Sequence, residues 1–195
     1  MIVLGLTGSI GAGKSTTAGF FRDEGVPVHD SDATVHRLYR GPLAQEVEAA
    51  FPGTTGPDGV DRAALGRAVL GDAAAIRRLE AIVHPPVREA EARFLARSRA
   101  EGVRVVVLDI PLLFETGAER RCDAVVVATV DPDVQRERVL ARPDMTADKL
   151  DAILARQTPD AEKRRRGHFL VDSGRGLASA RAQVRSILRA VNGAA

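Results

Sequence analysis

The chain has 195 residues, of which 45% are hydrophobic and 28% are charged, and its formal net charge is +2. This balance is typical of a soluble globular domain with an aliphatic core, and it argues against a disordered chain and against a strongly basic nucleic-acid-binding protein. Cys122 is the single cysteine, and we expect it to be a structural thiol. Since neither a signal peptide nor a membrane-spanning run is evident, we expect a cytoplasmic protein with no membrane or nucleic-acid partner.

Apolar runs alternate with segments of helical period along the chain. Strands are predicted by five short apolar runs, at 2–7, 26–30, 103–110, 123–130 and 168–173. Helices are predicted over 14–25, much of 33–101, 132–144, 146–157 and 177–192. Turn signals occur within the long helical block at 40–42, 51–59 and 83–86. Strands separated by helices of this length predict an α/β fold with a five-stranded parallel sheet.

The spacing of these elements predicts a single domain with three parts. We expect the sheet core to comprise about 1–32, 103–142 and 167–195. The block at 33–101 is long for one crossover, so part of it should form a helical subdomain. The stretch at 143–166 is polar, charged and without a strand, which suits a mobile lid. Near its end stands the basic run "EKRRRGH", which is either a solvated segment or an anion-binding one.

The segment "GSIGAGKS" at 8–15 matches the pattern G-x-x-x-x-G-K-[ST] between a predicted strand and a predicted helix, which is the context of a P-loop. Its glycines allow main-chain N–H groups to converge on a phosphate at a helix N-terminus. The residues expected to bind ATP are Gly11, Ala12, Gly13, Lys14, Ser15 and Thr16. Among them, Lys14 should contact the β- and γ-phosphates, and the Ser15 hydroxyl should ligate Mg²⁺.

A magnesium ion in such a site needs a second acidic anchor. Asp109 stands at the end of the apolar run 103–110, and ligands of open α/β sheets bind at the carboxyl ends of strands. We therefore predict that Asp109 is a second magnesium anchor, with a helix or turn cap as the alternative.

Several classes of P-loop protein remain possible at this point. The sequence lacks the Asn-Lys-x-Asp segment with which a GTPase reads its base, and a remodelling ATPase usually needs a longer chain. A short chain with an arginine-rich lid favours a small-molecule kinase, which must exclude water from the transferring phosphoryl group. A non-catalytic nucleotide-binding regulator is the third possibility.

A kinase also needs a proton-accepting group, such as a carboxylate, near the hydroxyl of the acceptor substrate. Asp30 and Asp32 follow the second predicted strand, and they would face the same way if the chain stayed extended there. One carboxylate could then accept the acceptor's proton, and the other could hold metal-bound water or cap a helix that begins near Ala33. Two plain capping carboxylates are the alternative.

Taken together and in this order, six segments resemble the dephospho-coenzyme A kinase family: "LTGSIGAGKST", "HDSDATVHRLYRGP", "DGVDRAAL", "HPPVR", "VVVLDIPLLFE" and "ARQTPDAEK". The resemblance covers Met1 to about Ser173. It implies a P-loop NTPase-type three-layer sandwich with a helical CoA-binding region and a lid. It also implies ATP-dependent phosphorylation of the 3′-hydroxyl of dephospho-coenzyme A, the last step of coenzyme A synthesis, by a monomer or weak homo-oligomer. Another small-metabolite or nucleoside kinase of this fold is the alternative.

The resemblance also implies roles for individual residues. Asp32 matches the second acid of the family's D-x-D and is the candidate general base, with Lys14 and Arg142 as further catalytic residues. The candidate substrate-binding residues are Asp32, Arg62, His84, Arg88 and Leu112. Arg142 is the first choice, and Arg138 the second, for the arginine that contacts the transferring phosphoryl group. Lys163 is expected to stabilise the lid. The segment 167–174, which in relatives lies near adenine, departs from the family pattern at Gly167–His168 and at Asp172–Ser173.

Overall fold

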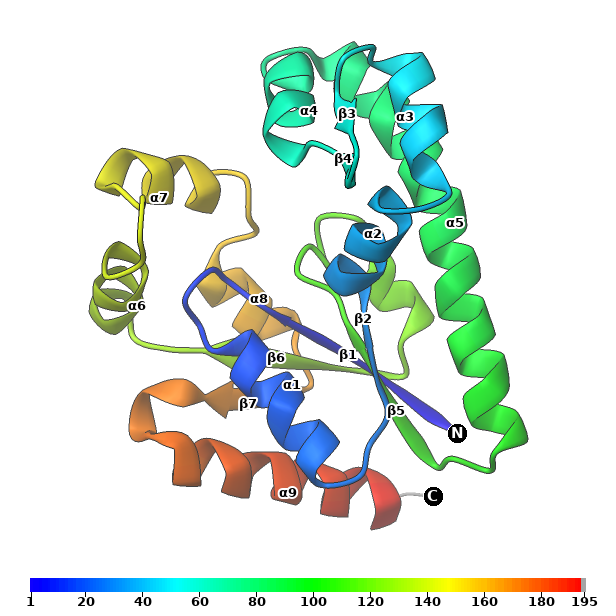
Figure 1. Ribbon diagram of the computed structural model, residues 1–195. Helices are drawn as coiled ribbons and strands as arrows, with labels where there is room; N and C mark the ends of the chain where they lie inside the picture. Colours follow the sequence, from blue (N-terminus) through cyan, green and yellow to red (C-terminus); the bar gives the residue numbers. More distant parts are fainter. Residues whose placement is uncertain (194–195) are drawn as a thin grey trace. The chain divides into compact units, whose positions relative to one another are not determined.

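The computed structural model describes residues 1–193, which form two compact units (Figure 1). The first unit combines residues 1–29 with the chain from Ser98 onward, and the second comprises Asp30–Arg97. We expected a helical subdomain at 33–101, and the second unit begins and ends a few residues before those bounds. Among the described residues, no helix is both long enough and apolar enough to cross a bilayer.

The first unit contains the five-stranded sheet that the sequence predicted. Its strands are β1 (Ile2–Gly8), β2 (Val28–Asp30), β5 (Val105–Asp109), β6 (Ala124–Thr129) and β7 (Phe169–Asp172), in the order β2-β5-β1-β6-β7. β1 pairs in parallel with β5 and with β6, and β6 pairs in parallel with β7. The carboxyl ends of these strands therefore share one edge of the sheet, where ligands bind in α/β proteins.

Helices flank this sheet. They are α1 (Lys14–Asp23), α6 (Pro132–Leu140), α7 (Ala147–Leu154), α8 (Asp160–Arg166) and α9 (Leu177–Gly193), with short 3₁₀ turns η1 (Ala118–Arg121) and η2 (Ser173–Arg175). α1 and α9 cover one face, where Phe21 and Val184 pack on alternate strand residues such as Leu4 and Leu6. On the other face, a Cβ added at Gly5 would meet Leu113 and Cys122 at 2.9 and 2.7 Å. Cys122 is thus the half-buried structural thiol that we expected.

The second unit has its own core. It consists of α2 (Ser31–Tyr39), α3 (Leu43–Ala50), β3 (Thr55–Gly56), β4 (Gly59–Val60), α4 (Arg62–Val69) and most of α5 (Ala73–Ala100). Leu43, Val47 and Leu65 are buried in this core. The two short strands pair as a hairpin where the sequence predicted only turns. Glu48 stabilises the hairpin by accepting hydrogen bonds from the Gly53 N–H and the Thr55 hydroxyl, and these bonds lower its pKa.

The turn predicted at 83–86 is wrong, because α5 passes through Pro85 and Pro86 without ending. Each proline removes one helical N–H and disfavours the helix before it. Packing outweighs this loss, since Val83 is buried in the core of the second unit and Val87 packs against the same core.

The chain does not stay extended at Asp30 and Asp32, because α2 already begins at Ser31, and the condition under which the two carboxylates would face the same way is not met. The Asp30 carboxylate caps this helix by accepting a hydrogen bond from the Ala33 N–H at 2.8 Å. Asp32 lies in the first helical turn and is exposed. The two carboxylates therefore have different tasks, which leaves Asp32 as the candidate for chemistry.

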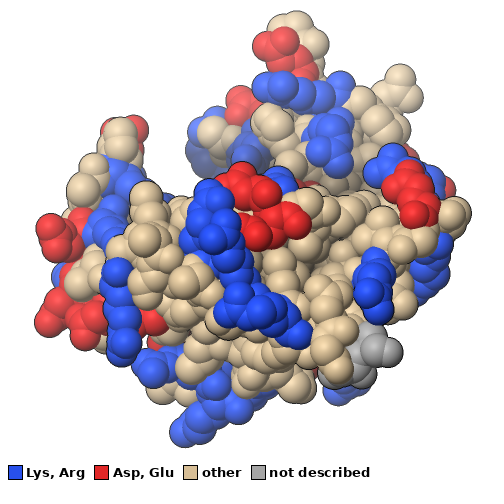
Figure 2. All heavy atoms as spheres, turned by 90° about the horizontal axis from the view of Figure 1, so that it is seen from below, with Lys and Arg blue, Asp and Glu red and all other residues tan. Residues whose placement is uncertain are grey.

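The face of the molecule that carries α9 shows Lys and Arg side chains interspersed with Asp and Glu (Figure 2). Ion pairs join α9 to the end of α1 on this face: Arg181 pairs with Asp23, and Arg185 pairs with Glu24. Such a mixed surface differs from the single basic face typical of nucleic-acid-binding proteins.

Candidate functional site

The P-loop connects the carboxyl end of β1 to the N-terminus of α1, as the sequence predicted. Gly11 and Gly13 have φ angles of 79° and 87°, which side chains with a Cβ rarely adopt. A Cβ at Gly11 would also stand 2.5 Å from Val139 of α6, and one at Gly13 would stand 2.9 Å from the Cβ of Ser173. Both glycines are thus required by backbone conformation and by close packing of α6 and η2 on the loop.

Lys14 and Asp109, two of the predicted site residues, are brought together at the carboxyl edge of the sheet. The Lys14 Nζ lies 2.6 Å from Oδ1 of Asp109, whose side chain is only 3% exposed. Ser15 and Thr16 stand exposed in the first turn of α1, where the positive end of the helix attracts anions.

This donor set fits a magnesium ion that also contacts phosphate. A carboxylate and a hydroxyl are hard oxygen ligands, and Mg²⁺ is commonly bound by one or two carboxylates together with substrate phosphates. Among residues 1–193, no group of three or more His, Cys, Asp or Glu side chains is arranged to hold a metal. A metal here would therefore depend on phosphate oxygens for much of its coordination.

Arg138, the second-choice arginine, contacts the segment that follows β7. Its guanidinium donates hydrogen bonds to the hydroxyl and to the carbonyl of Ser173, at 2.8 and 3.0 Å. Ser173 itself packs beside Gly13, so the contact connects α6, η2 and the P-loop. Arg142, the first choice, is exposed just after α6.

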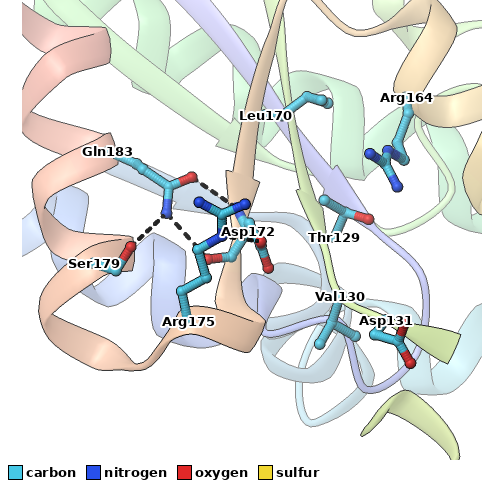
Figure 3. Close-up of a pocket in the computed structure, with 9 residues that line it drawn as sticks. All are labelled: Thr129, Val130, Asp131, Arg164, Leu170, Asp172, Arg175, Ser179 and Gln183. Carbon is cyan, nitrogen blue, oxygen red and sulfur yellow. Dashed lines mark hydrogen bonds and ion pairs between the residues drawn. The ribbon is translucent and has the colours of Figure 1, made fainter. Parts of the chain in front are cut away.

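A cavity of about 560 Å³ opens beside this segment, at the carboxyl ends of β6 and β7. It is lined by Thr129, Val130, Asp131, Arg164, Leu170, Asp172, Arg175, Ser179 and Gln183 (Figure 3). The Gln183 amide accepts a hydrogen bond from the Asp172 N–H at 2.9 Å and donates one to the Asp172 carbonyl at 3.1 Å. Gln183 therefore occupies the open edge of β7. The volume suits a ligand of nucleoside size.

Glu115 and Lys163 form a buried ion pair that the sequence did not reveal. The Lys163 Nζ lies 3.3 Å from Oε1 of Glu115, and the Lys163 side chain is fully buried. The same oxygen accepts a hydrogen bond from the Thr158 N–H at 2.6 Å. Burial alone would raise the pKa of Glu115, but the main-chain N–H groups of Thr158 and of Glu115 itself, together with the Lys163 charge, outweigh it and lower that pKa. The pair fastens α8 to the loop after β5.

We expect Glu115→Gln to lower the free energy of unfolding by about 3 kcal/mol at pH 7, since it leaves the Lys163 charge buried without a partner. The pKa of Glu115 in the folded chain lies below its ordinary value of 4.5. The stabilisation is therefore present above pH 4.5 and is lost as the pH falls through the folded pKa. Thermal unfolding between pH 3 and pH 7 should thus show that, as the pH falls, the stability of the wild type decreases more steeply than that of Glu115→Gln.

The double variant Glu115→Gln/Lys163→Met is the control for this prediction. It removes the buried charge together with its partner, and we expect it to regain part of the lost stability. A double variant less stable than Glu115→Gln alone would show that the pair is not the source of the effect.

The "DIPLLFE" segment separates into buried and exposed residues. Leu113 and Phe114 are buried, and the guanidinium of Arg166 lies 4.2 Å from the centre of the Phe114 ring. Leu112 is 43% exposed. Of these three side chains, Leu112 is therefore the one available to a substrate.

The remaining predicted residues belong to the second unit. Arg62 is exposed at the start of α4, and its charge acts on Tyr39, whose pKa is raised by burial and lowered in smaller part by this guanidinium. His84 and Arg88 are exposed on α5, four residues apart on one helix face, as expected.

Comparisons with known proteins agree with these features. A family model described as dephospho-CoA kinase matches residues 2–179. A protein of Mesorhizobium japonicum named dephospho-CoA kinase is 63% identical, over 99% of this chain and 98% of the relative. A protein of the same name from Rhodopseudomonas palustris is 60% identical, over 97% and 96% of the two chains.

Solved structures share the fold of this chain. A crystal structure of a Thermus thermophilus protein superposes with a TM-score of 0.87 at 34% identity, covering 97% of this chain and 96% of that one. A shikimate kinase from Bacteroides thetaiotaomicron, with a TM-score of 0.51 at 20% identity over 98% of each chain, shares the fold alone. These relatives cover nearly the whole chain, which also has the P-loop core and the helical second unit described above. The chain therefore belongs to the dephospho-CoA kinase family.

Proposed function

We propose that this protein transfers the γ-phosphoryl group of ATP to the 3′-hydroxyl of dephospho-CoA, giving coenzyme A and ADP. The observation that carries the proposal is the P-loop whose Lys14 converges with Asp109, in a chain that matches dephospho-CoA kinases over almost its whole length.

The donor phosphates are assigned to the P-loop. The main-chain N–H groups of Gly11 to Lys14 surround the β-phosphate, and Lys14 stabilises the charge that develops on the transferring group. Ser15 and Asp109 would hold Mg²⁺, which would neutralise the phosphate oxygens when bound. The cavity beside Asp172 is the candidate place for the nucleoside end of the donor, which agrees with the expected role of 167–174.

The acceptor side is assigned to the second unit, with Asp32 as the base. Asp32 follows His29 of β2 by three residues, which span at most about 10 Å, and β2 lies next to the strand that ends in Asp109. In the reaction, the 3′-oxygen attacks the γ-phosphorus while the bond to the β,γ-bridging oxygen breaks. The 3′-OH proton passes to the Asp32 carboxylate, and ADP leaves with the bridging oxygen.

The other predicted residues serve to bind and enclose the substrates. We assign Arg62, His84, Arg88 and Leu112 to the acceptor, because they are exposed and carry the cationic, imidazole or apolar groups that phosphate, hydroxyl and pantetheine-like chains require. Arg142 is assigned to the transferring phosphoryl group. Since Lys163 of α8 is buried and ion-paired, we assign lid movement to the part of 143–166 that precedes α8.

The test is a coupled assay with ATP, Mg²⁺ and dephospho-CoA, with coenzyme A identified by mass spectrometry. We expect phosphorylation of dephospho-CoA, and no comparable turnover of nucleosides, nucleoside monophosphates or shikimate. Consumption of ATP with one of these other acceptors, but not with dephospho-CoA, would replace the proposal with another small-molecule kinase.

A further inference from the structure

Ile10 lies in the middle of the P-loop, and glutamine side chains hold both its main-chain N–H and its main-chain carbonyl. Its carbonyl accepts a hydrogen bond from Nε2 of Gln135 at 2.7 Å. Its N–H donates a hydrogen bond to Oε1 of Gln157 at 3.2 Å. The Ile10 N–H belongs to the Ser9–Ile10 peptide and the Ile10 carbonyl to the Ile10–Gly11 peptide, so the two glutamines hold the two successive peptide groups on either side of the Ile10 Cα.

Gln135 comes from the segment before the predicted lid at 143–166, and Gln157 comes from within that lid. Gln135 belongs to α6, before Arg142, and Gln157 follows α7. α6 also packs directly on the loop, since the main-chain carbonyl of Gln135 lies 3.2 Å from where a Cβ on Gly11 would stand. Gln135 and Gln157 are themselves half-buried, which limits the competition of water for these bonds.

A loop of this kind needs such support. Gly11 follows Ile10 directly and has no Cβ to restrict its backbone, so the peptide between them is free to rotate. Rotation would turn the next N–H groups away from the phosphate, and a phosphate cradle works only when its donors are held in place beforehand. Gln135 holds the carbonyl of the Ile10–Gly11 peptide and Gln157 holds the N–H of the Ser9–Ile10 peptide, which restricts rotation on both sides of the Ile10 Cα.

We propose that Gln135 and Gln157 are positioning residues that clamp the two peptide groups flanking Ile10, so that the following P-loop amides face the donor phosphates. Neither side chain touches the reacting atoms in this proposal, which rests on the proposed phosphoryl transfer. Through the clamp, α6 and the segment after α7 are joined to the phosphate cradle, so loss of either bond should weaken ATP binding more than acceptor binding.

The sharpest test uses one substitution at both positions. Gln157→Glu keeps an oxygen that can accept from the Ile10 N–H. Gln135→Glu loses the donor and sets a carboxylate against the Ile10 carbonyl. Each adds one negative charge next to the main chain of the same residue, so the charge effect on ATP is shared and the difference in KM reports the hydrogen bond. We expect the KM for ATP to be at least about fivefold higher for Gln135→Glu than for Gln157→Glu.

Neutral variants and a surface control complete the test. Gln135→Met and Gln157→Met should each raise the KM for ATP by about fivefold, with a smaller change in the KM for dephospho-CoA. Their double variant should lose less affinity for ATP than the sum of the single variants, because both bonds hold the main chain of one residue. Gln45→Glu, on the exposed side of α3, should leave the kinetics unchanged. Thermal unfolding identifies any variant that has lost its fold.

The outcome is decisive in either direction. Equal KM values for the two Glu variants, or Met variants that bind ATP as the wild type does, would overturn the clamp. Binding of ATP, measured by calorimetry without an acceptor, keeps this test separate from the proposed function. If the wild-type protein failed to phosphorylate dephospho-CoA, the same comparison of ATP affinities would still decide whether the glutamines position the loop.

Discussion

Lys14→Ala is expected to lower kcat for phosphoryl transfer by about 10²-fold or more, because Lys14 is the cation that the P-loop places at the transferring phosphate. Affinity for ATP should fall less, since the main-chain N–H groups of the loop remain. Steady-state kinetics with both substrates, together with calorimetric ATP binding, separate the two effects.

The substitution also removes the ion-pair partner of the buried Asp109 carboxylate, so thermal unfolding must accompany the kinetics. Arg189→Ala, on the exposed side of α9, removes one positive charge from another surface and should leave the kinetics unchanged. A folded Lys14→Ala protein with wild-type turnover would contradict the assignment of Lys14 to the transferring phosphate.

Asp32→Asn is the second large effect, with an expected loss of at least about 10²-fold in kcat, the usual range for a group that accepts a proton from the nucleophile. The amide keeps the size of the side chain but cannot accept the proton of the 3′-hydroxyl. ATP affinity should remain, because Asp32 belongs to the second unit and the phosphate cradle to the first.

Asp58→Asn is the matched control, since Asp58 is an exposed carboxylate between β3 and β4 in the same unit. Asp30→Asn would be a poor control, because the Asp30 carboxylate caps α2 and its loss would disturb Asp32 itself. Unchanged turnover of Asp32→Asn would remove this residue from the mechanism and reopen the search for the base.

The sequence by itself determined the parts of this protein that local chain chemistry encodes. The glycine, lysine and serine spacing of 8–15 indicated a P-loop, and the structure places it between β1 and α1. The continuous apolar run at 103–110 predicted a strand buried on both faces, and every residue of β5 is buried. Backbone conformation, alternation of apolar residues and helix stops such as Gly25 depend on neighbours in the chain, so a local pattern suffices for them.

Only the tertiary structure decided the contacts between distant segments. Ile10 and Gln157 are 147 positions apart, and Glu115 and Thr158 are 43 apart, so no local pattern indicates that they meet. The helix that continues through Pro85 has the same physical origin. Local propensity disfavours it, and burial of flanking side chains, which exists only once the second unit has folded, outweighs that propensity.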